Sequence, residues 1–259
     1  MDMHCIWLIT HFNQSIIMEL FWIILIISVA SLIKGITGFG FALVALPPLL
    51  FWYTPIEIVP VLLMCNLVSS IIILLQKKEG KLVDHKFKPL IIFGGLFTIL
   101  GVLVLKKISG HYIIMGISIV FILLTILSLL KIEQTKKSLP SYTYKLAGAI
   151  VGFLSGSISV SGPPLAVFLN RAGVNNQQFR EIFSWFNLVT ALAAVVGYIH
   201  FDMLTTHSLK QVMLFSPILY LGSFIGKRIN GHMPAKSFKT ITMTLTLISC
   251  AFLLLKEMN

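Results

Sequence analysis

The chain has 259 residues, of which 57% are hydrophobic and only 11% are charged, with a mean hydropathy of +0.94. This composition leaves too little polar surface to coat a water-soluble globule of this length, which excludes a soluble protein. The 20 Lys and Arg residues exceed the 9 Asp and Glu residues, but they lie in short connectors between apolar runs, as in a membrane topology signal. We therefore expect one membrane domain, 1–259, in contact with a lipid bilayer and with no nucleic-acid partner.

Ten apolar elements follow one another along the chain and are expected to be helices. They are 16–33, 41–53, 55–76, 89–105, 112–130, 145–160, 163–169, 181–201, 209–226 and 237–255. The first is long enough to span, and no Lys or Arg precedes it, so we interpret it as mature structure and not as a signal peptide.

Two of these elements, 41–53 and 163–169, are unusual. Both contain or begin with Pro, and each follows a break rich in Gly or Ser, "GITGFG" at 35–40 and "GSISVSG" at 156–162. A spanning helix needs roughly 20 apolar residues, so 163–169 cannot cross a membrane alone. Each break with its neighbours therefore forms either two shortened spans or a re-entrant hairpin.

The two halves of the chain resemble each other at a spacing of 121 positions. This shift aligns Gly35 with Gly156, Asn66 with Asn187, and the turn "KKISGH" at 106–111 with "KRINGH" at 227–232. If the halves lie in opposite orientations, 16 Lys and Arg residues fall on one side of the membrane and 4 on the other, whereas parallel halves give 11 and 9. The positive-inside bias favours the inverted arrangement, with both termini outside the cytoplasm.

These observations predict an all-α integral membrane protein built from two inverted repeats, 16–130 and 145–255, of about five membrane elements each. The paired broken or re-entrant helices are expected near the midplane of the membrane. A homo-oligomer is compatible with the sequence.

The paired breaks are candidate binding sites, because irregular backbone at membrane depth is tolerated where it lines a protein-enclosed or water-filled cavity. Each break precedes a new helix, whose unpaired N–H groups and positive dipole end favour an anion. The candidate residues are those that shape the breaks (Gly35, Gly38, Gly40, Gly156, Gly162), begin the second short helix (Pro163) or offer a hydroxyl (Ser159, Ser161). Alternatively, the glycines serve only close helix packing.

Three polar residues near the breaks extend this set. Lys34 precedes the first break; if it lies deep it favours an anionic substrate, and if it lies near the surface it snorkels to the interface. Asn66 and Asn187 stand in apolar helices, where they form interhelical hydrogen bonds or contact the ligand. The cysteines have no metal or disulfide spacing, and no phosphate-binding Gly-x-x-x-x-Gly-Lys-Ser/Thr motif occurs, so we expect no metal, no cofactor and no ATP hydrolysis on this chain.

The stretches "KGITGFGFALVALPPLL" and "GFLSGSISVSGPPLAVFL", together with the internal repeat, resemble the TauE/SafE family of sulfite exporters and sulfonate permeases. The resemblance covers nearly the whole chain. It implies transport of sulfur-containing anions, such as sulfite or organosulfonates, across a bacterial inner membrane. The second break is richer in serine than the glycine-rich break usual in the family, so that Ser159 and Ser161 add hydroxyls where relatives offer backbone.

The preferred hypothesis is a secondary transporter for small anions, not an enzyme, which opens a site between the breaks alternately to each side. A second hypothesis is an intramembrane serine protease, because "SVSG" at 159–162 is similar to the Gly-x-Ser-Gly of rhomboid proteases, with His200 as the available base. A third hypothesis is a membrane scaffold without a path for solutes.

Overall fold

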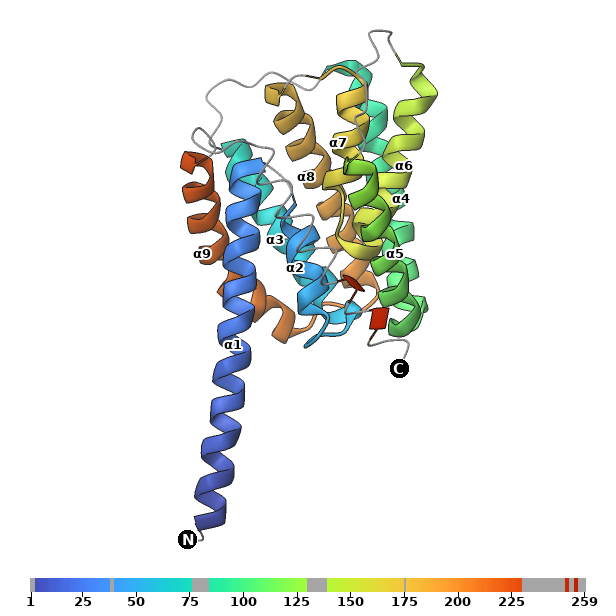
Figure 1. Ribbon diagram of the computed structural model, residues 1–259. Coiled ribbons are helices and arrows are strands. Elements are labelled where there is room, and N and C mark those ends of the chain that lie inside the picture. Colours follow the sequence, from blue (N-terminus) through green and yellow to red (C-terminus); the bar gives the residue numbers. More distant parts are fainter. Residues whose placement is uncertain are drawn as a thin grey trace.

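The computed structural model describes residues 3–37, 40–75, 84–129, 139–174, 176–229, 250–251 and 254–255. Within these ranges every regular element is a helix (Figure 1). The helices are α1 (Met3–Thr37), α2 (Phe41–Leu49), α3 (Pro55–Leu75), the 3-10 turn η1 (His85–Phe87), α4 (Lys88–Lys107), α5 (Gly110–Leu129), α6 (Ser141–Ile158), α7 (Gly162–Arg171), α8 (Asn176–His200) and α9 (Thr206–Ile229).

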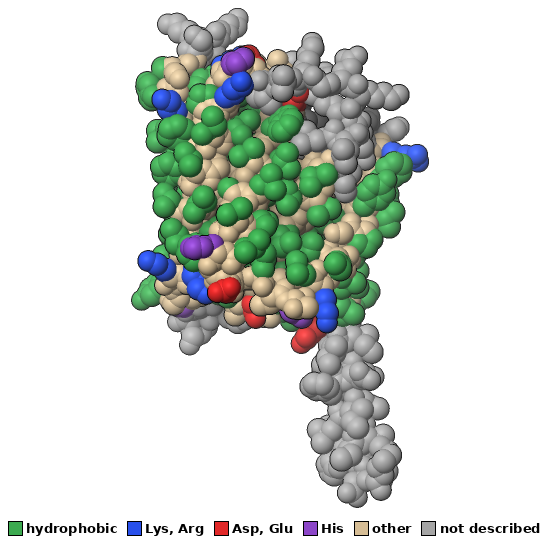
Figure 2. All heavy atoms as spheres, turned by 180° about the vertical axis from the view of Figure 1, so that it is seen from behind, with side chains coloured by type: hydrophobic (Ala, Val, Ile, Leu, Met, Phe, Trp, Pro, Cys, Tyr) green, Lys and Arg blue, Asp and Glu red, His purple; other side chains and the backbone are tan. Residues whose placement is uncertain are grey.

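An apolar surface surrounds the middle of the helix bundle. Figure 2 shows hydrophobic side chains across this zone on one face, with most of the charged side chains towards its two ends. Large hydrophobic side chains on the helices, such as Leu96, Val196 and Met213, are exposed, as expected for contact with lipid. In the described part of the chain, α1, α4, α8 and α9 contain stretches that are long and apolar enough to span a membrane. The prediction of an all-α integral membrane protein is confirmed.

Helices α4 and α6 pack with their backbones in close contact. α6 carries Gly148, Gly152 and Gly156 at every fourth position, and a Cβ atom on any of them would collide with the backbone of α4. The Thr98 hydroxyl of α4 donates a hydrogen bond to the carbonyl oxygen of Gly152 across this contact, at 3.0 Å. The absence of side chains on one face of α6 is therefore what brings the two helices together.

Helices α1 and α9 form a second pair of the same kind. Gly222 of α9 lies against Ser31 of α1, and Gly226 lies against Gly35. The contacting residue numbers rise together in this pair, and they do so in α4 and α6 as well, so both pairs are parallel. Each pair joins one helix from the first half of the chain (α1–α5) to one from the second half (α6 onward).

Several helix bounds coincide at the spacing of 121 residues. α1 ends at Thr37 and α6 at Ile158, α2 begins at Phe41 and α7 at Gly162, and α3 begins at Pro55 and α8 at Asn176. Figure 1 shows α1 and α6 running in opposite directions through the bundle. The two inverted repeats stay a prediction, because the expected last element at 237–255 and residues 230–232 of the second turn lie mostly outside the described residues.

Most helix bounds differ by a few residues from the expected ranges, and the first two helices differ in ways that affect the architecture. α1 begins at Met3, well before residue 16, and Figure 1 shows its first part projecting beyond the bundle. α2 ends at Leu49 and not at residue 53, with a turn at 50–53 leading into α3. Pro47 and Pro48 near the end of α2 lack the N–H groups needed to continue the helical hydrogen-bond pattern, which helps to keep this helix short.

Candidate functional site

The first break separates α1 from α2. Gly40 precedes α2 with φ 91° and ψ 1°, a left-handed conformation that glycine adopts without the steric cost of a Cβ atom. Its carbonyl oxygen accepts the first hydrogen bond of α2, from the N–H of Val44 at 3.1 Å. Gly38 lies outside the described residues. The glycine at position 40 thus redirects the chain and leaves the first amides of α2 without helical partners.

The second break separates α6 from α7 and includes a serine in an uncommon conformation. Ser159 ends α6 with φ 57°, and its N–H donates to the Ser155 carbonyl oxygen at 2.9 Å. Ser161 then precedes α7, and its carbonyl oxygen accepts from the N–H of Leu165 at 3.1 Å. Pro163 and Pro164 follow in the first turn of α7, where proline lacks a donor that the helix does not need.

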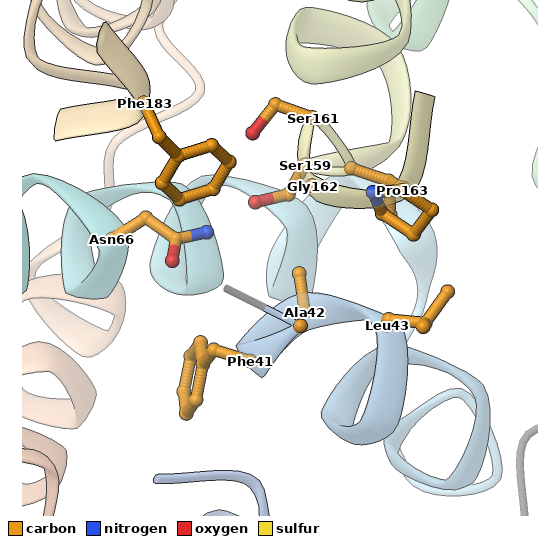
Figure 3. A pocket seen from close by; sticks show the side chains of 11 residues that line it. Phe41, Ala42, Leu43, Asn66, Ser159, Ser161, Gly162, Pro163 and Phe183 are labelled. Carbon is orange, nitrogen blue, oxygen red and sulfur yellow. The ribbon is translucent and has the colours of Figure 1, made fainter. Parts of the chain in front are cut away.

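The N-terminal ends of α2 and α7 meet at a small pocket (Figure 3), with a volume of about 10 Å³, close to the minimum for one water molecule. Side chains of α3 and α8 complete its wall. The lining residues are Gly40, Phe41, Ala42, Leu43, Asn66, Ser159, Val160, Ser161, Gly162, Pro163 and Phe183.

Asn66 of α3 links the pocket to a buried charge. Its Oδ1 atom accepts a hydrogen bond of 2.7 Å from the Nζ atom of Lys34. In Figure 3 its amide nitrogen points across the pocket toward the Ser159 hydroxyl. Lys34 itself is 2% exposed and lies behind the pocket wall, with Nζ 5.8 Å from the centre of the Phe41 ring. Lys34 therefore points into the protein, and the snorkelling alternative is not what this structure shows.

The Ser159 hydroxyl lines the pocket without a hydrogen-bond partner. The residue is 2% exposed, and its Oγ atom is buried and unpaired. Burying a hydroxyl without a partner costs roughly 1–3 kcal/mol, and a bound ligand with an acceptor atom removes this cost. The hydroxyl is thus a free donor facing the same space as the Asn66 amide.

Asn187 of α8 occupies the position that corresponds to Asn66 but has a different environment. It is buried, and its Oδ1 atom accepts a hydrogen bond of 2.7 Å from the Ser161 hydroxyl. Asn187 does not line the pocket, whereas Ser161 does. The role that the structure gives Asn187 is to hold the start of α7 against α8.

The remaining sequence candidates divide between pocket and packing positions. Gly40, Gly162 and Pro163 line the pocket. Gly35 packs against Ser223 and Gly226 of α9, and Gly156 packs against Thr98 of α4, so both serve the helix contacts that the sequence left as an alternative. The Ser161 hydroxyl is bonded to Asn187, whereas the ring of His200 contacts Phe201 at the end of α8, with 4.9 Å between the ring centroids.

Five lining residues were not among the sequence candidates: Phe41, Ala42, Leu43, Val160 and Phe183. The first four lie inside or directly after the breaks, so their inclusion follows from the break positions. Phe183 lies one helical turn before Asn187, on the same side of α8, and this spacing is the signal that would have found it.

The site is arranged to receive a negatively charged group. Two helix N-termini face the pocket, although Pro163 and Pro164 of α7 have no N–H to donate. The Asn66 amide and the Ser159 hydroxyl add side-chain donors, the buried Lys34 amine lies behind them, and none of the lining residues is acidic. Within the described ranges, no three His, Cys, Asp or Glu side chains gather closely enough to hold a metal ion.

Comparison with protein families matches residues 23–253 to the family described as Sulfite exporter TauE/SafE. Comparisons with curated proteins and with solved structures gave no match. The matched range holds both breaks, both asparagines and every residue that lines the pocket. Because the match covers nearly the whole chain, this multi-pass membrane protein belongs to the TauE/SafE sulfite exporter family, a family of membrane transporters.

Proposed function

We propose that the chain is a secondary transporter that carries small sulfur-containing anions, sulfite or an organosulfonate, across a cell membrane. The substrate binds in the pocket between α2 and α7, and the site opens alternately to the two sides of the membrane. By family resemblance, the membrane is a bacterial inner membrane.

The observation that carries this proposal is the meeting of two broken helices at one pocket that holds an unpaired buried hydroxyl. A helix N-terminus alone is a common feature, but Ser159 and Asn66 add two side-chain donors directed at the same space. A sulfite or sulfonate group presents three oxygen acceptors around one sulfur atom, so it satisfies several converging donors at once. A scaffold protein has no need of such donors, because leaving them unpaired costs free energy.

The size of the pocket indicates a closed state. A volume of about 10 Å³ has room for about one water molecule and not for a sulfonate group, so the lining elements must separate before substrate enters. The helix pairs suggest which units move. Since α1 is packed tightly against α9, and α4 against α6, each moving unit combines helices from both halves of the chain.

The proposal is tested by transport into proteoliposomes that contain the purified full chain. Saturable uptake of labelled sulfite or methanesulfonate is expected, with each anion competing against the other. Ser159→Ala is expected to raise the half-saturating concentration, whereas Ser157→Ala is a matched control, since the Ser157 hydroxyl donates to the Phe153 carbonyl oxygen of its own helix and does not line the pocket. Uptake no faster than in protein-free liposomes for both anions would refute the proposal.

A further inference from the structure

Lys34 is the only charged side chain that is buried in the described part of the chain. Its Nζ atom donates to Oδ1 of Asn66, and the nitrogen of the same amide group faces the pocket. The charge of Lys34 is thus one side chain away from the place where an anion would bind, although Lys34 itself does not touch the pocket.

No carboxylate in the described ranges pairs with Lys34. The titratable group facing it from α3 is the thiol of Cys65, and α2 presents the ring of Phe41. The part of α9 beside Gly35 presents glycine and serine, and the next described cation on that helix, Arg228, is exposed and lies over the Phe224 ring. The described residues around Lys34 therefore supply no counter-charge for a buried ammonium.

This arrangement couples the charge of Lys34 to occupancy of the pocket. Burial of an ammonium without a counter-charge is strongly unfavourable, whereas a neutral amine in the same position still donates its hydrogen bond to Asn66. An anion in the pocket supplies the counter-charge and stabilises the ammonium. By thermodynamic reciprocity, protonation of Lys34 must strengthen anion binding by the same factor.

We propose that Lys34 carries one proton with each transported anion, an inference that rests on the transport function proposed above. When an anion enters, the Nζ lone pair takes a proton from the water on the side to which the site is open, and the amine becomes an ammonium. When the anion leaves on the other side, the N–H bond breaks and the proton returns to water there. A monovalent anion and its proton then cross together without net charge.

The two halves differ at this position, so the second half has no counterpart of Lys34. The residue that corresponds to Lys34 at the spacing of 121 is Ser155, which is buried and neutral, and its backbone carbonyl accepts from Ser159. Lys34 is thus a charge-carrying residue in one half only.

Methanesulfonate is the suitable probe because it keeps one negative charge across the pH range used, so any pH dependence belongs to the protein. Its dissociation constant is measured on the purified full chain from about pH 6 to about pH 9, where an ordinary lysine stays protonated. We expect the constant to rise with pH, approaching roughly tenfold per unit where the empty site holds a neutral amine, since one proton is linked to each anion. In proteoliposomes loaded with a pH-sensitive dye, an inward methanesulfonate gradient is expected to acidify the lumen.

Two variants distinguish the effect of the Lys34 charge from the effect of replacing its side chain. Lys34→Arg keeps a permanent cation, so methanesulfonate binding is expected to lose its pH dependence and uptake its lumen acidification. Lys34→Gln is expected to bind methanesulfonate weakly at every pH. Lys145→Gln is the matched control, because Lys145 is an exposed lysine at the start of α6, and it is expected to keep the wild-type pH dependence.

If a variant does not fold, binding and uptake measured on the wild-type protein are enough to test the proposal. Saturable methanesulfonate uptake with a pH-independent dissociation constant and no acidification would overturn proton coupling and leave the transport function intact. Absence of binding and uptake for both methanesulfonate and sulfite would overturn the transport function itself, and the coupling with it.

Discussion

The hydroxyl of Ser161 donates a hydrogen bond of 2.7 Å to Oδ1 of Asn187, and both residues are buried. In the other half of the chain, Asn66 accepts a bond of the same length from Lys34. Corresponding asparagines thus hold the polar residues beside two helix breaks, but one bond comes from a hydroxyl and the other from an amine that can take up a proton. The two asparagines therefore differ in that only the one of the first half is bonded to an ionisable side chain.

Ser161→Ala is expected to destabilise the protein by about 1–3 kcal/mol, because it leaves the Asn187 oxygen buried without a donor. The measurement is the thermal unfolding midpoint in detergent. Ser216→Ala is the control, since its hydroxyl donates to the Val212 carbonyl oxygen within α9, and a much smaller shift is expected there. Equal midpoints for the two variants would contradict the role given to the Ser161–Asn187 bond.

The Ser161→Ala variant also separates transport from proteolysis. A transporter is expected to keep part of its anion uptake without this hydroxyl, and the wild-type protein is not expected to react with a serine-directed phosphonate. Labelling of Ser161 by the phosphonate would instead support the protease hypothesis.

Ser159 can be replaced in two ways that differ in stability but not in chemistry. Ser159→Gly and Ser159→Ala both remove the free hydroxyl, and each is expected to weaken methanesulfonate binding roughly tenfold or more, the worth of a hydrogen bond to a charged group. Ser159→Gly should in addition be more stable than Ser159→Ala by about 1 kcal/mol, because a φ of 57° strains a residue with a Cβ atom. Titration calorimetry and thermal unfolding of the two proteins measure the two effects. Unequal affinities would show that the backbone, and not the hydroxyl, sets binding.

Asn66→Asp is expected to abolish anion binding while the protein stays folded. The new carboxylate would lie beside the Lys34 ammonium, supply its missing counter-charge and repel an anion from the pocket. Asn187→Asp is the contrasting variant, because its buried carboxylate would face the neutral Ser161 hydroxyl, so destabilisation is expected instead. Binding assays and unfolding midpoints compare them. Full anion affinity in Asn66→Asp would place the binding site elsewhere.

Gly152→Ala is expected to destabilise the protein by about 1–3 kcal/mol, because the added methyl group collides with the backbone of Gly94 and forces α6 away from α4. Gly116→Ala on α5 is the control, since a Cβ atom there meets nothing within 4 Å. The control should be neutral or stabilised by about 0.5–1 kcal/mol, because alanine favours a helix over glycine. The thermal unfolding midpoints report both changes, and a stable Gly152→Ala protein would contradict the tight contact.

The positions of the breaks could be predicted from the sequence because Gly, Ser and Pro act on their own stretch of backbone. Phe41 and Gly162 begin helices directly after the expected breaks, and Asn66 lies at the pocket that the breaks form. These features depend on local conformation and on a spacing that can be read along the chain.

Features that depend on the choice of partner helix could not be predicted. The sequence is compatible with Gly35 and Gly156 either lining a site or packing against another helix. In the structure α9 packs against Gly35 and α4 packs against Gly156. The inward direction of Lys34 depends on α3 offering Asn66 as an acceptor, which no local pattern indicates. Phe183 is indicated only by its place one helical turn before Asn187, since an aromatic residue in an apolar helix is otherwise ordinary.

The parallel pairing of α1 with α9 and of α4 with α6 bears on how the protein is made. The ribosome completes α1 near the start of translation, whereas α9, which packs against it, is synthesised much later. Until then, the face of α1 that carries Gly35 must be in contact with lipid or with another helix. A chain cut between α5 and α6 gives two fragments, and neither fragment contains both helices of the α1–α9 pair or of the α4–α6 pair. Co-production of both fragments would restore each contact, so the intact protein is one interlocked assembly and not two modules joined by a linker.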